Sequence, residues 1–374
     1  MKLGRFKGAF NRIALPCVPY ISPLWGRKLL SKADSLARLM PYSVYRVENA
    51  PIPLARLVSN NGLPFFESHN PISFSPDYVW SISHLGPKPA VRVVPSGNIV
   101  LDGRCHLNLD FRPLRGLIQS HTIVRSEQSI IACWAHGWRS YFDFVMFVLV
   151  KLVRMEHALG SKTLTSTYLA YSQFHQPFEI ELLAMLGISP DAVINTTSLR
   201  GALTAKTVIT ANNHSVYYPS PRDLRRLRDR FPPSRSGGMT RKFYLSRSKN
   251  RRVTNELELL PILRKYDIEF LGDEPRSVQE QIDLFSSASL IIGPHGANFT
   301  NILWARKDAH VIELFSRSYY PPYYYYLAEV IGQHYSCCIE RTNVGSPHTM
   351  SSQYHDMYIH PSDLEHCIRE TLAP

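Results

Sequence analysis

The clearest alternation of apolar and polar positions lies in the last third of the chain. Four apolar runs have strand length and two stretches between them have helical spacing: strands at 242–246, 267–271, 290–292 and 311–315, and helices at 255–265 and 278–288. Two pairs, Asn255 with Glu258 and Ser277 with Glu280, have the spacing of a capping box where these helices begin. Strands that alternate with helices predict a parallel α/β sheet.

Upstream the pattern is less regular. Residues 1–75 are rich in Pro and aromatic side chains without a clear period, which indicates an irregular N-terminal extension. From residue 90 strands and helices alternate again: strands at 91–94, 99–101, 163–167, 192–195 and 207–210, and helices at 141–159 and 179–186. Prolines and a Gly-Gly pair at 219–240 indicate a linker, so we expect one α/β lobe at 76–218 and a second at 241–374. A final helix is expected at 361–371, and it could cross back to the first lobe.

Composition is that of a globular protein, with 44% hydrophobic and 19% charged residues. The net charge of +12 is concentrated, because residues 222–252 hold twelve Lys and Arg against only Asp223 and Asp229. This basic block suits a nucleic acid, an anionic membrane surface or a phosphorylated small molecule. Six cysteines are too sparse for a disulfide framework and indicate reduced thiols.

The most apolar window, residues 141–153, contains Asp143 and Lys151 and is shorter than the ~20 residues of a membrane-spanning helix. The apolar stretch after the basic N-terminus is short and interrupted by prolines, unlike a signal peptide. We therefore expect a cytoplasmic protein, with peripheral contact to an anionic membrane as an additional role for the basic block.

Residues 290–298 carry the most specific signal in the chain. The apolar run at 290–292 meets Gly293-Pro294, and His295-Gly296-Ala297-Asn298 then opens a predicted helix. The free N–H groups at such a helix start, beside a His and an Asn, form a ready site for a phosphate or a developing anion.

These pieces together resemble glycosyltransferase family 61. The resemblance rests on 243–247, Phe-Tyr-Leu-Ser-Arg, followed by Arg251-Arg252, on the helix near 279–288, and on 290–298 continuing to 311–315. It implies a GT-B arrangement of two Rossmann-like lobes with a cleft between them, the first acceptor-binding and the second nucleotide-sugar-binding. It further implies an inverting, metal-independent transfer from a nucleotide sugar, UDP-linked in most such families, to a saccharide, glycoconjugate or lipid-linked acceptor in polysaccharide biosynthesis, without a cofactor.

The resemblance assigns donor binding to seven positions. Arg247 and Arg251 would clamp the diphosphate, as expected where no metal neutralises it. The N–H groups of Gly296, Ala297 and Asn298 would complete the clamp, and His295 would donate to a phosphate or sugar hydroxyl. Glu313 would hold the ribose hydroxyls. For Arg247 the alternative is a solvated surface charge, and for His295 a histidine satisfied by local backbone; Lys249 and Arg252 are more consistent with surface charges.

An inverting transfer also needs a general base from the first lobe. The family places a His a few residues before an acid at the start of a long helix. Here Asp143 takes the place of the acid, while Arg139 stands at the expected His position and His136 lies one turn earlier. Asp143 is the first candidate base and His136 the second; the alternative for Asp143 is a structural carboxylate beside Arg139 or Lys151.

Two other functions remain open from the residues alone. The basic block at 222–252 fits a nucleic-acid-binding protein, although no recognition motif accompanies it. His295 could instead be the nucleophile of a phosphotransferase, although the sequence shows no acid paired with it. The tyrosine-rich run at 319–326 could stack on a base or a sugar, or could pack inside the lobe.

Overall fold

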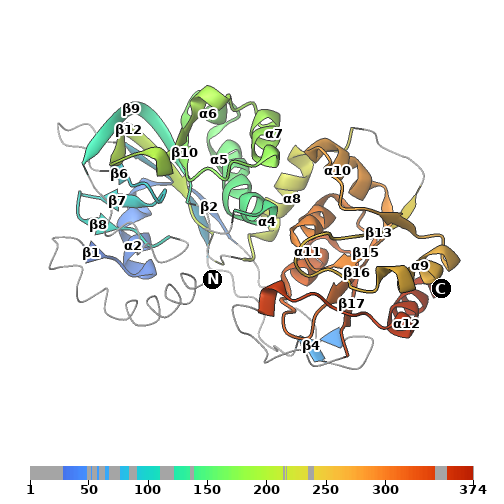
Figure 1. Cartoon of the computed structure of the whole chain (residues 1–374). Coiled ribbons are helices and arrows are strands. Elements are labelled where there is room, and N and C mark those ends of the chain that lie inside the picture. The colour runs from blue at the N-terminus through green and yellow to red at the C-terminus, as the bar shows by residue number, and fades with distance from the viewer. Residues whose placement is uncertain are drawn as a thin grey trace. The chain divides into compact units, whose positions relative to one another are not determined.

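The computed structural model describes residues 28–48, 76–83, 91–109, 122–134, 139–213, 217–234, 240–341 and 352–373, with short pieces at 52, 57–58, 64–66 and 215. The chain forms two compact units (Figure 1). The first consists of Met1–Asn49 with Phe74–Asp223, and the second of Ala50–Ser73 with Leu224–Pro374. Each unit is built on its own main sheet, so the α/β class expected from the sequence is confirmed.

The first unit contains a ten-stranded mixed sheet. Its parallel part has the order β12-β9-β10-β11, and antiparallel strands continue it on the other side of β12. The strands are β1 (Lys28–Leu29), β2 (Ser43–Val47), β5 (Asp77–Ser83), β6 (Val91–Val93), β7 (Ile99–Leu101), β8 (Cys105–His106), β9 (Ile123–Ala132), β10 (Tyr168–Tyr171), β11 (Val193–Asn195) and β12 (Ala202–Ala211). The antiparallel strands depart from a simple Rossmann-like lobe.

The long helix expected at 141–159 is present and buried along most of its length. It consists of α4 (Tyr141–Asp143), a π-helical turn η3 (Phe144–Leu149) and α5 (Val150–Leu159). The prediction of a strand at 163–167 is wrong, because the helix α6 (Lys162–Thr165) covers most of these residues. There the hydroxyls of Thr163 and Ser166 donate to backbone carbonyls one turn earlier, which favours a helical turn over an extended chain. The other helices of this unit are α2 (Lys32–Leu39), η2 (Met40–Tyr42), α7 (Pro177–Met185), η4 (Pro190–Ala192) and η5 (Thr196–Ser198).

A charged group inside the first unit is fully paired. Arg154 on α5 is 0% exposed; its Nε lies 2.7 Å from Asp223 Oδ2, and its Nη2 lies 3.4 Å from Asp77 Oδ2. Nη1 donates to the backbone carbonyl of Asn212 at the end of β12. Since a buried charge is tolerated only with partners of this kind, the cluster fixes α5 to β5 and β12.

The second unit contains a five-stranded sheet in the order β14-β13-β15-β16-β17, and all its pairings are parallel. Its strands are β13 (Arg241–Leu245), β14 (Glu269–Leu271), β15 (Ala288–Pro294), β16 (His310–Phe315) and β17 (His334–Ile339). Its helices are α8 (Pro221–Arg230), α9 (Glu256–Lys265), α10 (Val278–Ser286), η6 (Ala297–Trp304), α11 (Tyr323–Ile331), η7 (Ser352–Tyr354) and α12 (Pro361–Leu372). A separate pair, β3 (Leu57–Val58) with β4 (Pro64–Phe66), also belongs to this unit.

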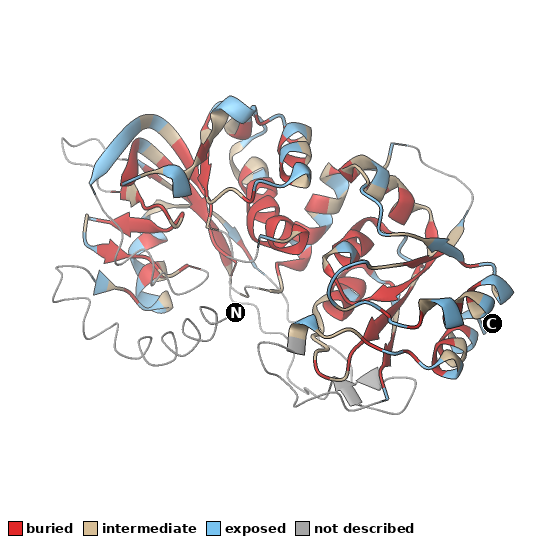
Figure 2. Ribbon diagram, in the orientation of Figure 1, coloured by how far each residue is buried: buried red, intermediate tan, exposed pale blue. Residues whose placement is uncertain are grey.

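Helices cover both faces of this sheet. Leu259 and Leu263 of α9 and Leu364 of α12 form a core with the side chains that face them from β13, β15 and β16. On the opposite face Phe243 packs edge to face against Phe285 of α10. Figure 2 shows the central strands buried and the outer faces of α9 and α12 exposed. A sheet covered on both faces explains why its strands are continuous apolar runs.

The region expected to be a linker, 219–240, is partly helical. Its helix α8 contains the boundary between the two units, after Asp223. Leu224, Leu227 and Phe231 are buried, and Arg228 Nη1 donates to the carbonyls of Leu303 and Ala305. Arg228 of the basic block therefore does not face an external partner, because it satisfies carbonyl groups at the end of η6.

Two further details differ from the sequence-based expectation. β15 does not end at Gly293 but continues through Pro294, because both residues still pair with β16. The capping box is confirmed for Ser277 and Glu280 at α10. Asn255 does not cap α9; its side-chain amide instead exchanges two hydrogen bonds with the backbone of Ile359. These two hydrogen bonds connect the segment before α12 to the start of α9.

Candidate active site

The strand order of the second unit reverses at one place. From β13 the chain passes through α9 to β14 on one side, then through α10 to β15 on the other side of β13. The chain therefore leaves β13 toward β14 and leaves β15 toward β16, so the connections diverge between β13 and β15. In open α/β sheets ligands bind outside the carboxyl ends of the strands at this switch point. Arg247 follows β13 and His295 follows β15, so both predicted donor-binding segments meet here.

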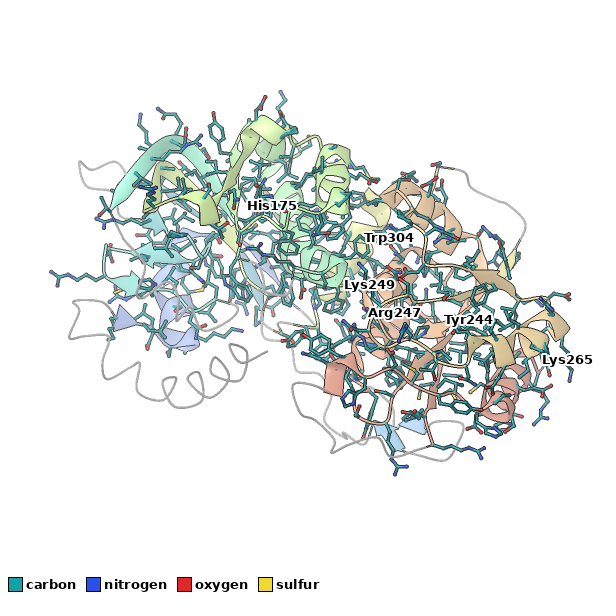
Figure 3. All side chains as sticks on the ribbon, in the orientation of Figure 1. His175, Tyr244, Arg247, Lys249, Lys265 and Trp304 are labelled. Carbon is teal, nitrogen blue, oxygen red and sulfur yellow. The ribbon has the colours of Figure 1, made fainter. Side chains whose placement is uncertain are left out.

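The loop after β13 is held on both sides. Tyr244 Oη and Ser246 Oγ donate to the two carboxylate oxygens of Glu256, at 2.9 and 2.8 Å, in the first turn of α9. Ser248 donates through its N–H and its hydroxyl to Asp273 Oδ2, at 2.9 and 2.6 Å. Figure 3 shows Tyr244 in β13, with Arg247 and Lys249 in the loop beyond it.

Arg247 is directed toward the turn after β15. Its Nε donates to Asn250 O at 2.5 Å, and its Nη1 lies 3.5 Å from His295 O. A Cβ atom on Gly296 would lie 1.6 Å from Arg247 Nη1 and 2.9 Å from its Cζ. Gly296 is therefore the residue that makes room for the guanidinium group, rather than one required by its own backbone angles.

Arg251 lies beside Arg247 and has an unusual conformation. Its φ is 65°, and its guanidinium carbon lies 5.7 Å from the ring centre of Tyr319. Its Nε is buried and has no hydrogen-bond partner among the described residues. A non-glycine residue at positive φ is strained, and such strain concentrates at functional sites.

The two arginines place two positive charges side by side. Among the described residues neither Arg247 nor Arg251 forms a salt bridge, whereas the next residue, Arg252, is paired with Asp356 at 2.7 Å. Burial, together with the charge of Arg251, lowers the pKa of Arg247 to about 10. Two cations held close together in a partly buried place favour a bound anion, and guanidinium groups suit a phosphate.

His295 and Glu313 form a buried hydrogen-bonded pair next to Arg247. His295 Nδ1 lies 2.5 Å from Glu313 Oε1, and Tyr335 Oη lies 2.5 Å from Glu313 Oε2. The side chain of Glu313 is 0% exposed and that of His295 is 5% exposed. Both carboxylate oxygens are thus occupied by protein groups. The predicted contact of Glu313 with ribose hydroxyls is not supported by this geometry, and the acid that the sequence did not reveal beside His295 is Glu313.

Aromatic rings surround His295. Phe315 stacks on it with ring centres 5.2 Å apart, and Tyr324 and Tyr319 lie at 5.3 and 5.4 Å. Tyr324, Tyr325 and Tyr326 are buried. The tyrosine-rich run therefore packs mainly inside the second unit, and its two less buried members near His295 are Tyr319 and Tyr323.

The turn after His295 leads into η6, a helix that begins at Ala297 with Gly296 before it. The first N–H groups of a helix have no partner within the helix. Ala297 is half-buried and Asn298 exposed, so their N–H groups lie near the surface beside Arg247. The four predicted residues 295–298 and the two arginines are thereby brought together. Glu313 is linked to this group of residues by its hydrogen bond with His295.

The candidate bases of the first unit give a different result. His136 lies outside the described residues. Asp143 is buried, and its Oδ2 accepts hydrogen bonds from Ser140 N at 2.9 Å and Ser140 Oγ at 2.7 Å. Ser140 Oγ in turn accepts from Asp143 N, which completes a capping box for α4. This geometry favours a structural role for Asp143, with Ser140 as its partner in addition to any contact with Arg139 or Lys151.

His175 was not predicted as a functional residue. It is exposed, has a φ of 61° and follows β10 at the carboxyl edge of the parallel strands. Its N–H and that of Phe174 donate to Glu179, and its Nε2 lies 3.3 Å from Asn195 Nδ2 beyond β11. No sequence motif marks this His, because Asn195 becomes its neighbour only through the pairing of β10 with β11.

No group of three or more His, Cys, Asp or Glu side chains able to hold a metal occurs among the described residues. In the same part of the chain no helix is long and apolar enough to cross a membrane.

The fold and the site together define an α/β protein in which two arginines and the start of a helix meet at the carboxyl edge of a parallel sheet. The family model described as Glycosyltransferase 61 matches residues 87–312, which is more than half of the chain. The protein belongs to glycosyltransferase family 61 and is thus a glycosyltransferase with a donor and an acceptor substrate. No curated protein sequence matches it. The family assignment replaces the nucleic-acid-binding and phosphotransferase alternatives.

Proposed function

We propose that the protein transfers a sugar from a UDP-linked donor to a saccharide or glycoconjugate acceptor, with inversion and without a metal ion. The observation that carries this proposal is the pair of arginines, Arg247 and Arg251, at the switch point without an acidic partner. A departing nucleoside diphosphate carries negative charge that must be stabilised in the transition state. Two guanidinium groups and the N–H groups at the start of η6 supply donors for that charge.

The direct test is calorimetric binding of UDP, GDP and CMP in the presence of EDTA. We expect UDP to bind the wild-type protein, and Arg247→Ala to weaken binding by about tenfold or more, because a hydrogen-bonded charge pair contributes about 1.5–3 kcal/mol. Lys249→Ala is the matched control, since it removes one exposed positive charge from the same loop; we expect its affinity to stay within about twofold of wild type.

Two results would contradict the proposal. If no nucleotide binds, the arginine pair is not a donor site. If binding requires a divalent cation that EDTA removes, the transfer is not metal-independent.

The stereochemical part needs a separate measurement. A panel of saccharide acceptors with UDP-sugars identifies a productive pair, and the anomeric coupling constant of the product then reports its configuration. We expect the configuration opposite to that of the donor. A product with the donor's configuration would show a retaining enzyme while leaving the donor site intact.

The peripheral membrane contact and the lipid-linked acceptor remain proposals with less support. Arg228 of α8 is used inside the second unit, and Arg225 Nη2 lies 3.4 Å from Val330 O. A salt-sensitive association with anionic vesicles that Arg222→Ala weakens would support the membrane contact, because Arg222 is exposed on this helix.

A further inference from the structure

In the buried pair of His295 and Glu313, the question is which side chain donates the hydrogen bond between them. Tyr335 Oη can donate to Glu313 Oε2, which is 2.5 Å away. The remaining carboxyl oxygen, Oε1, lies 2.5 Å from His295 Nδ1, and one proton lies between them. If Glu313 holds this proton, His295 keeps its own ring proton on Nε2. If His295 holds it on Nδ1 and remains neutral, Nε2 has only a lone pair.

We propose that Glu313 is a positioning residue that stays protonated, donates to His295 Nδ1 and so leaves His295 Nε2–H as a neutral donor to the donor substrate's diphosphate. This role of Nε2 rests on the proposed function above, while the protonation of the pair does not. Nε2 has no hydrogen-bond partner among the described residues, and the His295 side chain is 5% exposed, so this nitrogen is the atom of the pair left to meet a ligand.

The charges around the pair support this direction. Among the described residues the carboxyl group of Glu313 hydrogen-bonds to the hydroxyl of Tyr335 and the ring of His295, and it forms no ion pair with Lys or Arg. Burial raises the pKa of Glu313 well above its usual range, against the opposite effects of the Tyr335 hydrogen bond and Arg251. Burial and the charges of Arg251 and Arg247 lower the pKa of His295 well below its usual range. Both shifts favour the uncharged forms, because a cation beside two arginines and an anion in a dry interior are each costly.

The arrangement also explains why a histidine suits this position. A phosphate already facing Arg247 and Arg251 accepts hydrogen bonds, so a lone pair on Nε2 would repel it. A neutral N–H adds a donor without adding a third buried positive charge. Tyr335 and Glu313 lie on β17 and β16, so the donor's orientation is fixed by the sheet itself.

The first test measures the tautomer without a ligand. Long-range ¹H–¹⁵N correlation spectra of the histidine-labelled full-length protein distinguish Nε2–H from Nδ1–H, and the spectrum of His295→Asn assigns the signal. We expect Nε2–H with no titration between about pH 6 and 8, where an unperturbed histidine would titrate. An Nδ1–H tautomer, or an imidazolium that titrates in this range, would overturn the proposal whether or not UDP binds.

The second test uses two substitutions of Glu313 and measures UDP affinity. In Glu313→Gln the amide N–H can donate to Nδ1 while the amide oxygen accepts from Tyr335, so it reproduces a protonated carboxyl group. We expect Glu313→Gln to retain the Nε2–H tautomer and UDP affinity within about twofold of wild type. Glu313→Ala should lose the fixed tautomer and about tenfold in affinity, as expected when a hydrogen bond to a charged group is lost.

The outcomes separate the two proposals. Loss of affinity in Glu313→Gln equal to that in Glu313→Ala, with both variants folded by circular dichroism, would show that Glu313 acts as an ionised acceptor. Tyr335→Phe provides a milder change at the same carboxyl group if Glu313→Ala does not fold. If the tautomer is as expected but UDP does not bind the wild-type protein, the proton arrangement holds and the proposed function fails.

Discussion

At the scale of single residues, two arginines show how charge pairing separates a structural role from a proposed ligand-binding role. Arg154 is 0% exposed and lies between two carboxylates, Asp77 and Asp223. Arg251 has a buried Nε without a partner and lies next to another arginine, Arg247. Burying a charge is costly unless it is paired, and the two arginines without an ion pair among the described residues are therefore the ones that we propose to face a ligand.

Gly296→Ala tests whether Arg247 must occupy its observed place. The added Cβ would displace the guanidinium end of Arg247, which is flexible, so we expect UDP to bind more weakly with a stability loss below about 1 kcal/mol. Calorimetry and urea unfolding measure the two quantities. Gly293→Ala is the contrasting control, since its Cβ would lie 2.9 Å from the backbone oxygen of Leu245 and should lower stability more. Unchanged UDP affinity in Gly296→Ala would remove Arg247 from the site.

His310 predicts a dependence of stability on pH. Its ring stacks on that of His334, with centres 4.5 Å apart, and burial and His334 lower the pKa of His310. Between the folded and unfolded pKa values the unfolded chain binds a proton that the folded chain does not. The free energy of unfolding should therefore fall as the pH is lowered below about 6.5. His310→Gln should reduce this slope in urea unfolding between about pH 5 and 7; an unchanged slope would contradict the shift.

At the scale of elements, short helices depend on side chains at their first positions. α4 begins the long buried helix of the first unit, and Ser140 and Asp143 satisfy each other's backbone N–H groups there. The same arrangement of Ser277 and Glu280 begins α10 in the second unit. A carboxylate oxygen that accepts two hydrogen bonds in a cap, as Asp143 Oδ2 does, is a poor proton acceptor, because it must give them up to take a proton.

Asp143→Asn distinguishes the cap from the base. The amide oxygen can still accept one hydrogen bond from Ser140, so we expect a loss of about 1 kcal/mol in stability and retained transferase activity. Ser140→Ala is the control that weakens the same cap without removing the carboxylate. If activity is lost in Asp143→Asn but kept in Ser140→Ala, Asp143 is the general base. If both variants retain activity, His175 becomes the next candidate for the base.

At the scale of the whole molecule, each unit has its own sheet and its own hydrophobic core. The proposed donor site lies entirely within the second unit, whereas Arg154 and its two carboxylates lie within the first. Damage to the Arg154 cluster should therefore affect the first unit without altering the residues that contact a nucleotide.

Arg154→Ala should lower the stability of the first unit by about 3–5 kcal/mol, because it leaves two buried carboxylates without their cation. Hydrogen exchange measured by mass spectrometry should show lost protection in β5 and β12, with β13, β15 and β16 unchanged. Arg125→Ala is the control, since its pair with Glu127 is more exposed and should contribute less than about 1 kcal/mol. Equal loss of protection in both sheets would show that the two units unfold together.

The sequence by itself determined the class of fold and the two segments of the proposed donor site. Fully buried parallel strands need continuous apolar runs, and these runs marked β13, β15 and β16 to within a few residues. Arg247 and the residues from His295 to Asn298 follow two of those strands directly, so their position at the carboxyl edge of the sheet could be predicted. The Ser277 cap could be predicted for a similar reason, since its partner is three residues away.

Only the tertiary structure decided the roles of residues whose partners are distant in the sequence. Glu313 was expected to face a ligand, but its oxygens meet His295 and Tyr335, which lie 18 and 22 residues away on neighbouring elements. Asn255 had the spacing of a cap, yet it binds Ile359 across 104 residues. Local spacing is fixed by the chain itself, whereas contacts across a sheet depend on strand order and register, and these arise only when the whole unit packs.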